Sequence, residues 1–297
     1  MNHYGINDIH IANQIIGEMK IKRLSQLSHR CKIKVSVDSR EGIDQLEDYF
    51  DNPEYRLPVL IEVDTGMNRC GIRSASDAIE MVKRIERSAK ICFHGIASHS
   101  GNIYQTESRE GVLKVAAEEV AIMLRIANKI RSEGIHVQVI SIGSTPAALY
   151  IENMKGITEF RPGNYVFNDR IQVSLGVAKI EDCALSIIAT VISKPAVGRI
   201  IIDAGSKCLG LDRGVHGNQL LTGFGYIKEY PRAVIERLSE EHGIIQIPDN
   251  LSIEIGDRIT IIPNHACSVT NLFDFAYVVK DQQVIDRWQI IARGKVT

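Results

Sequence analysis

The sequence predicts an α/β protein that combines a TIM-type (β/α) barrel lacking some of its strands with a mostly antiparallel β-domain. In residues 1–170, short apolar strands alternate with amphipathic helices, as in parallel βαβ units. From about Ile171, segments rich in β-branched residues are separated by Gly, Asp and Pro turns. A chain of 297 residues is long enough for a large core, and we expect two domains, residues 1–170 and 171–297.

The strands expected in the first domain are short and apolar, and one long helix stands out at residues 107–132. Asp38 and Ser39 suit the N-terminus of one helix, and Ser76 is expected to cap another. The expected strands are residues 9–12, 33–37, 57–63, 91–97, 137–142 and 156–160. In the second domain, only residues 231–242 look helical. The strands expected there are residues 184–193, 199–202, 251–262, 275–279 and 284–292.

Composition excludes several classes of function. The net charge is −1 with Lys and Arg scattered among acids, so no nucleic-acid partner is expected. No apolar run approaches the roughly 20 residues that span a membrane, and the first residues do not resemble a signal peptide. The cysteines are widely and irregularly spaced, which favours reduced thiols and a cytoplasmic protein; they are Cys31, Cys70, Cys92, Cys183, Cys208 and Cys267.

A polar turn near the middle of the chain is a candidate anion site. Gly143 follows a predicted buried strand, Thr145 suits a helix N-cap and Pro146 suits the first helical position. Free backbone amides and the helix dipole would then favour a phosphate or another anion. An ordinary turn between a strand and a helix is the alternative.

Other polar residues follow predicted strands, where the chemistry of a βα barrel collects. Arg69 lies in the turn 64–71 and could reach an anion or a ring heteroatom, or could pair with an Asp of its own loop. His99 could act in the site or satisfy a loop carbonyl. In the segment 161–167, Gly163 and Asn164 can turn their amides toward the anion of the Gly143 turn.

His265 and Cys267 form a candidate metal pair in the second domain. In an extended segment their side chains would point the same way, because side chains alternate along a strand. Imidazole and thiolate suit zinc, and two protein ligands leave positions open for water or substrate. A coincidental His-x-Cys is the alternative.

Five segments taken together resemble one family: residues 62–71, 143–146, 161–167, 202–207 and 263–267. They resemble the D-threonine aldolase/D-serine dehydratase family, relatives of alanine racemase with a fold-type III pyridoxal phosphate (PLP) barrel. The resemblance implies that Arg69 lies beside the cofactor ring. It also implies a zinc or manganese ion on His265 and Cys267, and catalytic roles for these two residues with Arg69 and His99. The phosphate would be held by Gly143, Ser144, Thr145, Gly163, Asn164 and Tyr165.

The resemblance further implies a lyase of D-3-hydroxy amino acids, acting as a homodimer. A metal that binds the substrate β-hydroxyl favours either cleavage to glycine and an aldehyde or elimination to a keto acid and ammonia. Cys267 at the second ligand position resembles the dehydratase branch more than the aldolases. The alternatives are a PLP-binding protein without catalysis and an inactive remnant.

One family feature has no counterpart in this sequence. The family places its Schiff-base lysine in a His-x-Lys-Thr motif on the first barrel strand, and residues 9–16 match the third strand instead. Lys32, Lys34 and Lys207 do not match the required position. Without that lysine the usual base is lost. We therefore expect that the first two βα units are missing from the N-terminus. A truncated sequence, whose upstream part carries the motif, is favoured; a decayed gene and a chain completed by another segment are the alternatives.

Overall fold

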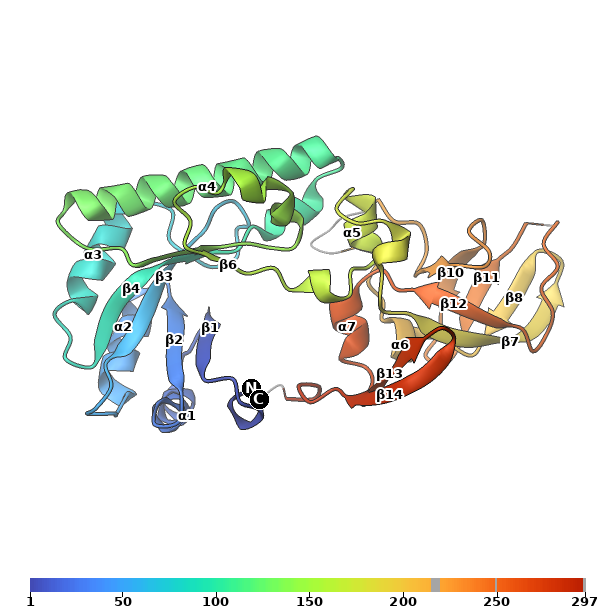
Figure 1. The fold of residues 1–297 in the computed structure, drawn as a ribbon, viewed down its shortest axis with the longest axis horizontal. Coiled ribbons are helices and arrows are strands. Elements are labelled where there is room, and N and C mark those ends of the chain that lie inside the picture. Colours follow the sequence, from blue (N-terminus) through green and yellow to red (C-terminus); the bar gives the residue numbers. More distant parts are fainter. Residues whose placement is uncertain (215–219, 249, 296–297) are drawn as a thin grey trace. The chain divides into compact units, whose positions relative to one another are not determined.

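A computed structural model describes residues 1–214, 220–248 and 250–295 of the chain (Figure 1). Its contacts divide the chain into two compact units. The first unit comprises residues 1–103 and 113–162, and the second comprises residues 104–112 and 163–297. Each unit is described by itself below.

The first unit contains a parallel half-barrel sheet in which every strand pairs with its neighbour in sequence. This confirms the predicted incomplete barrel. The strands are β1 (Asp8–Gln14), β2 (Lys32–Val37), β3 (Leu57–Val63), β4 (Ile91–Ser98), β5 (Val139–Ile142) and β6 (Glu159–Phe160). β3 is buried at nearly every position, as expected of a parallel strand covered on both faces.

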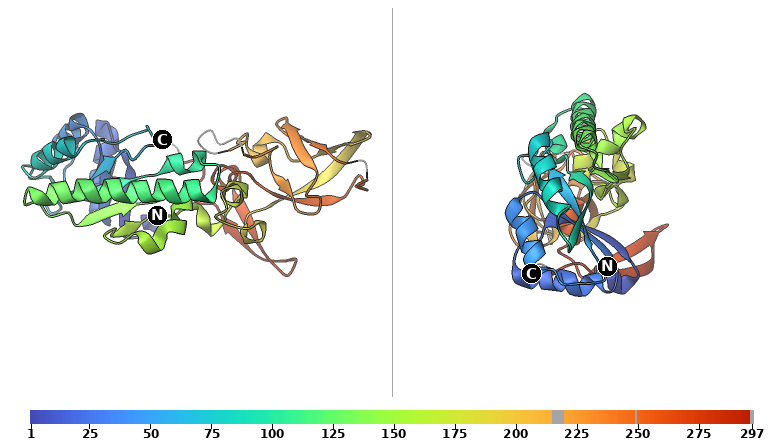
Figure 2. Two further views of the ribbon diagram at one scale, coloured as in Figure 1. Left: turned by 90° about the horizontal axis from the view of Figure 1, so that it is seen from above. Right: turned by 90° about the vertical axis from the view of Figure 1, so that its left-hand side faces the viewer.

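Helices alternate with these strands (Figures 1 and 2). They are α1 (Glu18–Ser28), α2 (Arg40–Tyr49), α3 (Ala75–Ile85) and the long α4 (Arg109–Ser132), with 3-10 turns η1 (Asn2–Tyr4), η2 (Gly101–Gln105) and η3 (Pro146–Asn153). Ser39 caps α2 by accepting a hydrogen bond from the Gly42 amide at 3.2 Å. The predicted cap of α3 is wrong by two positions, because Ser74 accepts the bond from the Asp77 amide at 3.0 Å and Ser76 lies inside the helix.

The second unit is built on an antiparallel sheet with strand order β10-β11-β8-β7-β12-β9 and a separate hairpin, which confirms the predicted β-rich second part. The sheet contains β7 (Ile187–Ala196), β8 (Arg199–Ile202), β9 (Tyr226–Ile227), β10 (Val234–Leu238), β11 (Gly243–Gln246) and β12 (Arg258–Ile262), and the hairpin contains β13 (Phe275–Lys280) and β14 (Gln283–Gln289). Short helical elements complete the unit: α5 (Arg170–Ser174), α6 (Ser206–Leu209), α7 (Ala266–Thr270), η4 (Asn164–Val166) and η5 (Ile180–Asp182).

The helix predicted at residues 231–242 is wrong, because this segment contains strand β10. β10 pairs with β11 antiparallel, and Ile235 is fully buried in the core of the sheet beside Ile245. Burial against neighbouring strands has outweighed the helical preference of Ala, Glu, Arg and Leu in this segment.

No helix in the described ranges is long and apolar enough to cross a bilayer.

Candidate functional site

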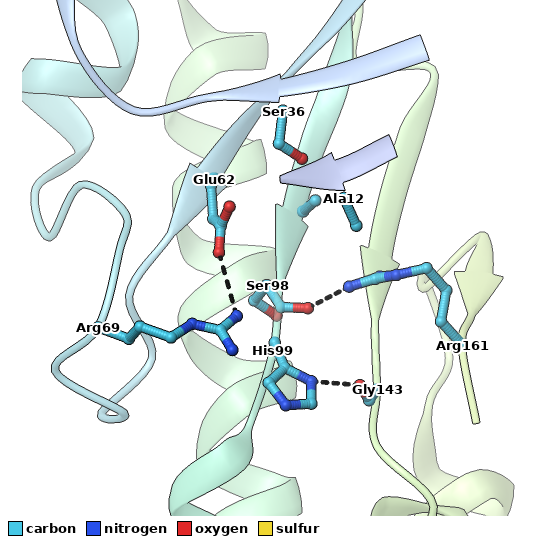
Figure 3. Close-up of a pocket in the computed structure, with 9 residues that line it drawn as sticks. Ala12, Ser36, Glu62, Arg69, Ser98, His99, Gly143 and Arg161 are labelled. Atoms are coloured by element: carbon cyan, nitrogen blue, oxygen red, sulfur yellow. Dashed lines mark hydrogen bonds and ion pairs between the residues drawn. The ribbon is translucent and has the colours of Figure 1, made fainter. Parts of the chain in front are cut away.

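A cavity of about 210 Å³ lies within the first unit, at the carboxyl ends of its parallel strands (Figure 3). Ser98 ends β4, Gly143 follows β5 and Arg161 follows β6. Neighbouring strands therefore each contribute a residue to the wall of the cavity. This end of a parallel barrel is where catalytic residues collect. The lining consists of Ala12, Ser36, Glu62, Arg69, Ala97, Ser98, His99, Gly143 and Arg161.

Two arginines give the cavity positive charge. Arg69 pairs with the buried carboxylate of Glu62 at 3.8 Å, so it does not form the Asp pair considered from the sequence. Arg73 takes that role by pairing with Asp64 at 2.8 Å. Arg161 donates to the Ser141 hydroxyl at 2.8 Å and to the Ser98 carbonyl at 2.5 Å.

The Gly143 turn forms one wall of the cavity. Gly143 has φ +126°, and a Cβ atom there would lie 2.6 Å from the Phe160 ring, so only glycine fits. The carbonyl of Gly143 lies 3.1 Å from His99 Nδ1, which places His99 on a loop carbonyl as well as in the cavity wall. Ser144 and Thr145 are buried, and Pro146 is the first residue of η3 as predicted, although the Thr145 side chain makes no capping bond.

Behind the turn lies a carboxyl group on α4. Glu119 is 1% exposed and accepts a 2.6 Å hydrogen bond from Ser98 Oγ. Burial raises the pKa of Glu119, and hydrogen bonds from Ser98, Ser100 and the Gly143 amide only partly oppose that rise. The Ser98 end of β4 and the Gly143 turn are thus tied to the same helix.

The candidate metal pair lies in the second unit, where its segment is helical from Ala266 and does not meet the condition of an extended strand. His265 is the N-cap of α7 and Cys267 lies in the first turn of that helix. The two side chains nevertheless interact: a hydrogen bond with Cys267 raises the pKa of His265. Cys267 is exposed as a free thiol.

Asp212 orients the imidazole of His265. Its Oδ2 atom lies 2.9 Å from His265 Nδ1 and accepts a 2.6 Å bond from Ser268, which leaves His265 Nε2 for another ligand. Burial acts to lower the pKa of His265, but the Cys267 and Asp212 hydrogen bonds outweigh it and raise the pKa to about 9. A carboxylate behind a histidine in this way is typical of metal ligands.

The remaining predicted phosphate ligands, Gly163, Asn164 and Tyr165, belong to the second unit. Tyr165 is 59% exposed. The Asn164 side chain is buried, and its Nδ2 atom lies 2.6 Å from Asp169 Oδ2 and 3.8 Å from Cys267 Sγ. The Gly143 turn and these three residues therefore fall in different units, and their common role on one phosphate stays a prediction.

Sequence reasoning missed Arg161, Glu119, Asp212 and Asp169 as site residues. Arg161 stood within a recognised motif, directly after a predicted strand, and that position was a usable signal. Glu119 sits in a long helix, Asp212 lies 53 residues from its partner His265, and Asp169 lies 97 residues from its partner Ala266. No local pattern indicates such contacts.

Comparison with known proteins identifies the family. The alanine racemase N-terminal domain matches residues 6–170, and a putative serine dehydratase domain matches residues 184–279. A D-threonine aldolase from Arthrobacter sp is 30% identical over 294 residues, covering 98% of this chain and 75% of the relative. The chain belongs to the D-threonine aldolase/D-serine dehydratase family. Its relatives are fold-type III PLP enzymes.

Other members of the family show the same likeness. A D-serine dehydratase from Dictyostelium discoideum is 30% identical over 280 residues, covering 87% of this chain and 71% of the relative. The crystal structure of the D-threonine aldolase from Filomicrobium marinum matches with a TM-score of 0.90 at 26% identity, covering 100% of this chain and 79% of that one. The D-threo-3-hydroxyaspartate dehydratase from Delftia sp. HT23 matches with a TM-score of 0.87 at 29% identity, covering 97% and 79%.

Proposed function

We propose that this family member is a PLP- and metal-dependent lyase of D-3-hydroxy amino acids. The observation that carries the proposal is the His265–Cys267 pair with Asp212 behind it, in a chain whose relatives include D-threonine aldolase and D-serine dehydratase. One site of this kind supports cleavage to glycine and an aldehyde or elimination to a keto acid. Cys267 favours the elimination.

The cavity of the first unit fits the cofactor. At Gly143 the turn has no side chain, so its backbone can come close to a bound cofactor. The buried Ser144 and Thr145 follow at the start of η3, and the start of a helix favours an anion. Arg69 and Arg161 supply cationic donors for an anionic, heteroaromatic ligand. PLP bound there would supply an electron sink for the substrate.

The His265–Cys267 pair fits a divalent metal. The donors are an imidazole nitrogen and a thiolate sulfur, which suit zinc and leave positions open for a substrate oxygen. In the described residues no group of three or more His, Cys, Asp and Glu side chains is placed to close such a site. Solved variants of a D-threo-3-hydroxyaspartate dehydratase replace a histidine and a cysteine that stand two positions apart, as these two do here, and the cysteine variant is in a metal-free form. A metal bound here would polarise a hydroxyl group.

The test of cofactor binding is a PLP titration followed by absorbance. Gly143→Ala should weaken PLP binding by about tenfold or more, which corresponds to roughly 1.4 kcal/mol, because its Cβ atom would displace the Phe160 ring. Gly134→Ala is the matched control, since Gly134 also has a positive φ of +80° but has open space around it. Equal PLP affinity in both variants would contradict the assignment of the turn.

The test of activity uses PLP and Zn²⁺ or Mn²⁺ with D-threonine, D-serine and 3-hydroxy-D-aspartate. A keto acid identifies a dehydratase, and glycine with an aldehyde identifies an aldolase. His265→Ala and Cys267→Ala should remove both bound metal and product formation. No product from any of the three substrates would refute the lyase.

A second candidate is a PLP-binding protein without catalysis. One observation favours it: among the described residues that line the cavity there is no lysine to anchor the cofactor aldehyde. This candidate predicts PLP binding that depends on Gly143 but no product, with or without metal. A homodimer also stays a prediction, which light scattering of the purified chain would test.

A further inference from the structure

Asp169 is a fully buried carboxylate that joins three segments of the second unit. Its Oδ1 atom accepts the Gln172 amide at 3.1 Å and so caps α5. Its Oδ2 atom accepts Asn164 Nδ2 at 2.6 Å and the Ala266 amide at 2.9 Å. Oδ1 therefore binds only the start of α5, whereas Oδ2 is the atom that binds the α7 segment.

Both partners of Oδ2 touch the candidate metal pair. Ala266 stands between His265 and Cys267, so a bond to its amide fixes the backbone from which both side chains project. Asn164 directs the same Nδ2 group toward Cys267 Sγ at 3.8 Å, within reach of a hydrogen bond to sulfur. Because Asp169 accepts from this amide nitrogen, it also fixes which end of the Asn164 amide faces the sulfur.

From this geometry we infer that Asp169 and Asn164 are positioning residues for the metal pair: Asp169 sets the α7 backbone and Asn164 donates to the ligand sulfur. The inference rests on the proposed function, since it concerns the same metal. Hydrogen bonds to a metal-bound sulfur and to the backbone of its ligands tune metal affinity and the electronic properties of the site.

Burying a carboxylate is costly unless hydrogen bonds satisfy it. A neutral cap such as Asn would satisfy the α5 terminus equally well. It would not accept from Asn164 and Ala266 at the same atom while capping α5, because an amide has a single acceptor oxygen. A carboxylate at this position is therefore required by the hydrogen bonds to Asn164 and Ala266, and not by the cap of α5.

The experiment is a Co²⁺ titration of the purified chain, read by the thiolate-to-cobalt absorption band and by competition with a chromophoric chelator. Asp169→Asn should lower Co²⁺ affinity by about 10- to 100-fold, as measured for outer-shell partners of metal ligands elsewhere. Asn164→Ala should shift the absorption band, because the sulfur loses its donor. Neither readout requires turnover.

Asp182→Asn is the matched control, because Asp182 accepts a backbone amide at the start of η5 in the same unit and should leave the band unchanged. Circular dichroism would show whether Asp169→Asn folds. If it does not, the band of Asn164→Ala tests the inference, because this variant keeps the Asp169 cap of α5. A wild-type band that neither variant alters would overturn this inference alone. Absence of the band from the wild-type chain would overturn the metal site and the inference together.

Discussion

Glu119 contributes to the change in the stability of the first unit with pH. Its pKa is raised from 4.5 by burial, so the folded chain keeps a proton that the unfolded chain releases. Stability from this group is therefore greatest below the unfolded pKa and falls as the pH rises through the folded pKa. Arg161 is the cation that opposes the rise, through its own charge.

Glu119→Gln removes the buried ionisation and keeps an acceptor for Ser98. We expect the variant to melt a few degrees above the wild type at pH 7, where roughly 1 kcal/mol shifts the melting temperature by about 2–4 °C in a unit of this size. The difference should shrink toward pH 4, and thermal melts across this range would show it. A variant that melts lower at every pH would mean that the ionised carboxylate stabilises the fold.

At the scale of single residues, the sequence placed Arg69, His99 and Gly143 in one site, and the structure lines one cavity with them. Gly143 could be predicted because its position after a buried strand constrains the backbone locally. Arg161 could be singled out by its place after a predicted strand, but its contact with Ser98, 63 residues away, could not be predicted. The contact of Glu119 with Ser98, 21 residues away, could not be predicted either.

At the scale of elements, the two serines near the start of α3 give a direct test of capping. Ser74 accepts the Asp77 amide and Ser76 does not cap. Ser74→Ala should lower the free energy of unfolding by about 1 kcal/mol. Ser76→Ala, the residue that the sequence favoured, should have a smaller effect, since alanine suits a helix interior. Urea denaturation of both variants would decide, and equal losses would contradict the observed cap.

The strands of the first unit were predictable because a parallel sheet covered on both faces leaves near-continuous apolar runs, as in β3. β10 was mistaken for a helix because its alternating pattern is weak, with only Ile235 fully buried among Val234, Glu236 and Arg237. The helix α7 was missed because it is a single turn, whose start depends on the Asp169 bond to Ala266.

At the scale of the whole molecule, each unit has its own apolar core. Ile61 is fully buried in the first and Ile235 in the second. Ile61→Ala and Ile235→Ala should each lower the free energy of unfolding of their unit by about 2–5 kcal/mol. Each variant should therefore lower the melting temperature of a different transition in calorimetry. A single transition that both variants lower would show that the two units unfold together.

The segment Tyr104–Val112 has a consequence for how the chain folds during synthesis. It follows β4 in sequence and includes the first turn of α4, but it packs with the second unit. There Tyr104 bonds Gln172 and Arg109 bonds the Gly176 carbonyl, 68 and 67 residues later. At about 5–20 residues per second, the ribosome needs roughly 3–14 seconds to make those partners. During that interval the first sheet can form strand by strand, while this link remains available to chaperones and proteases.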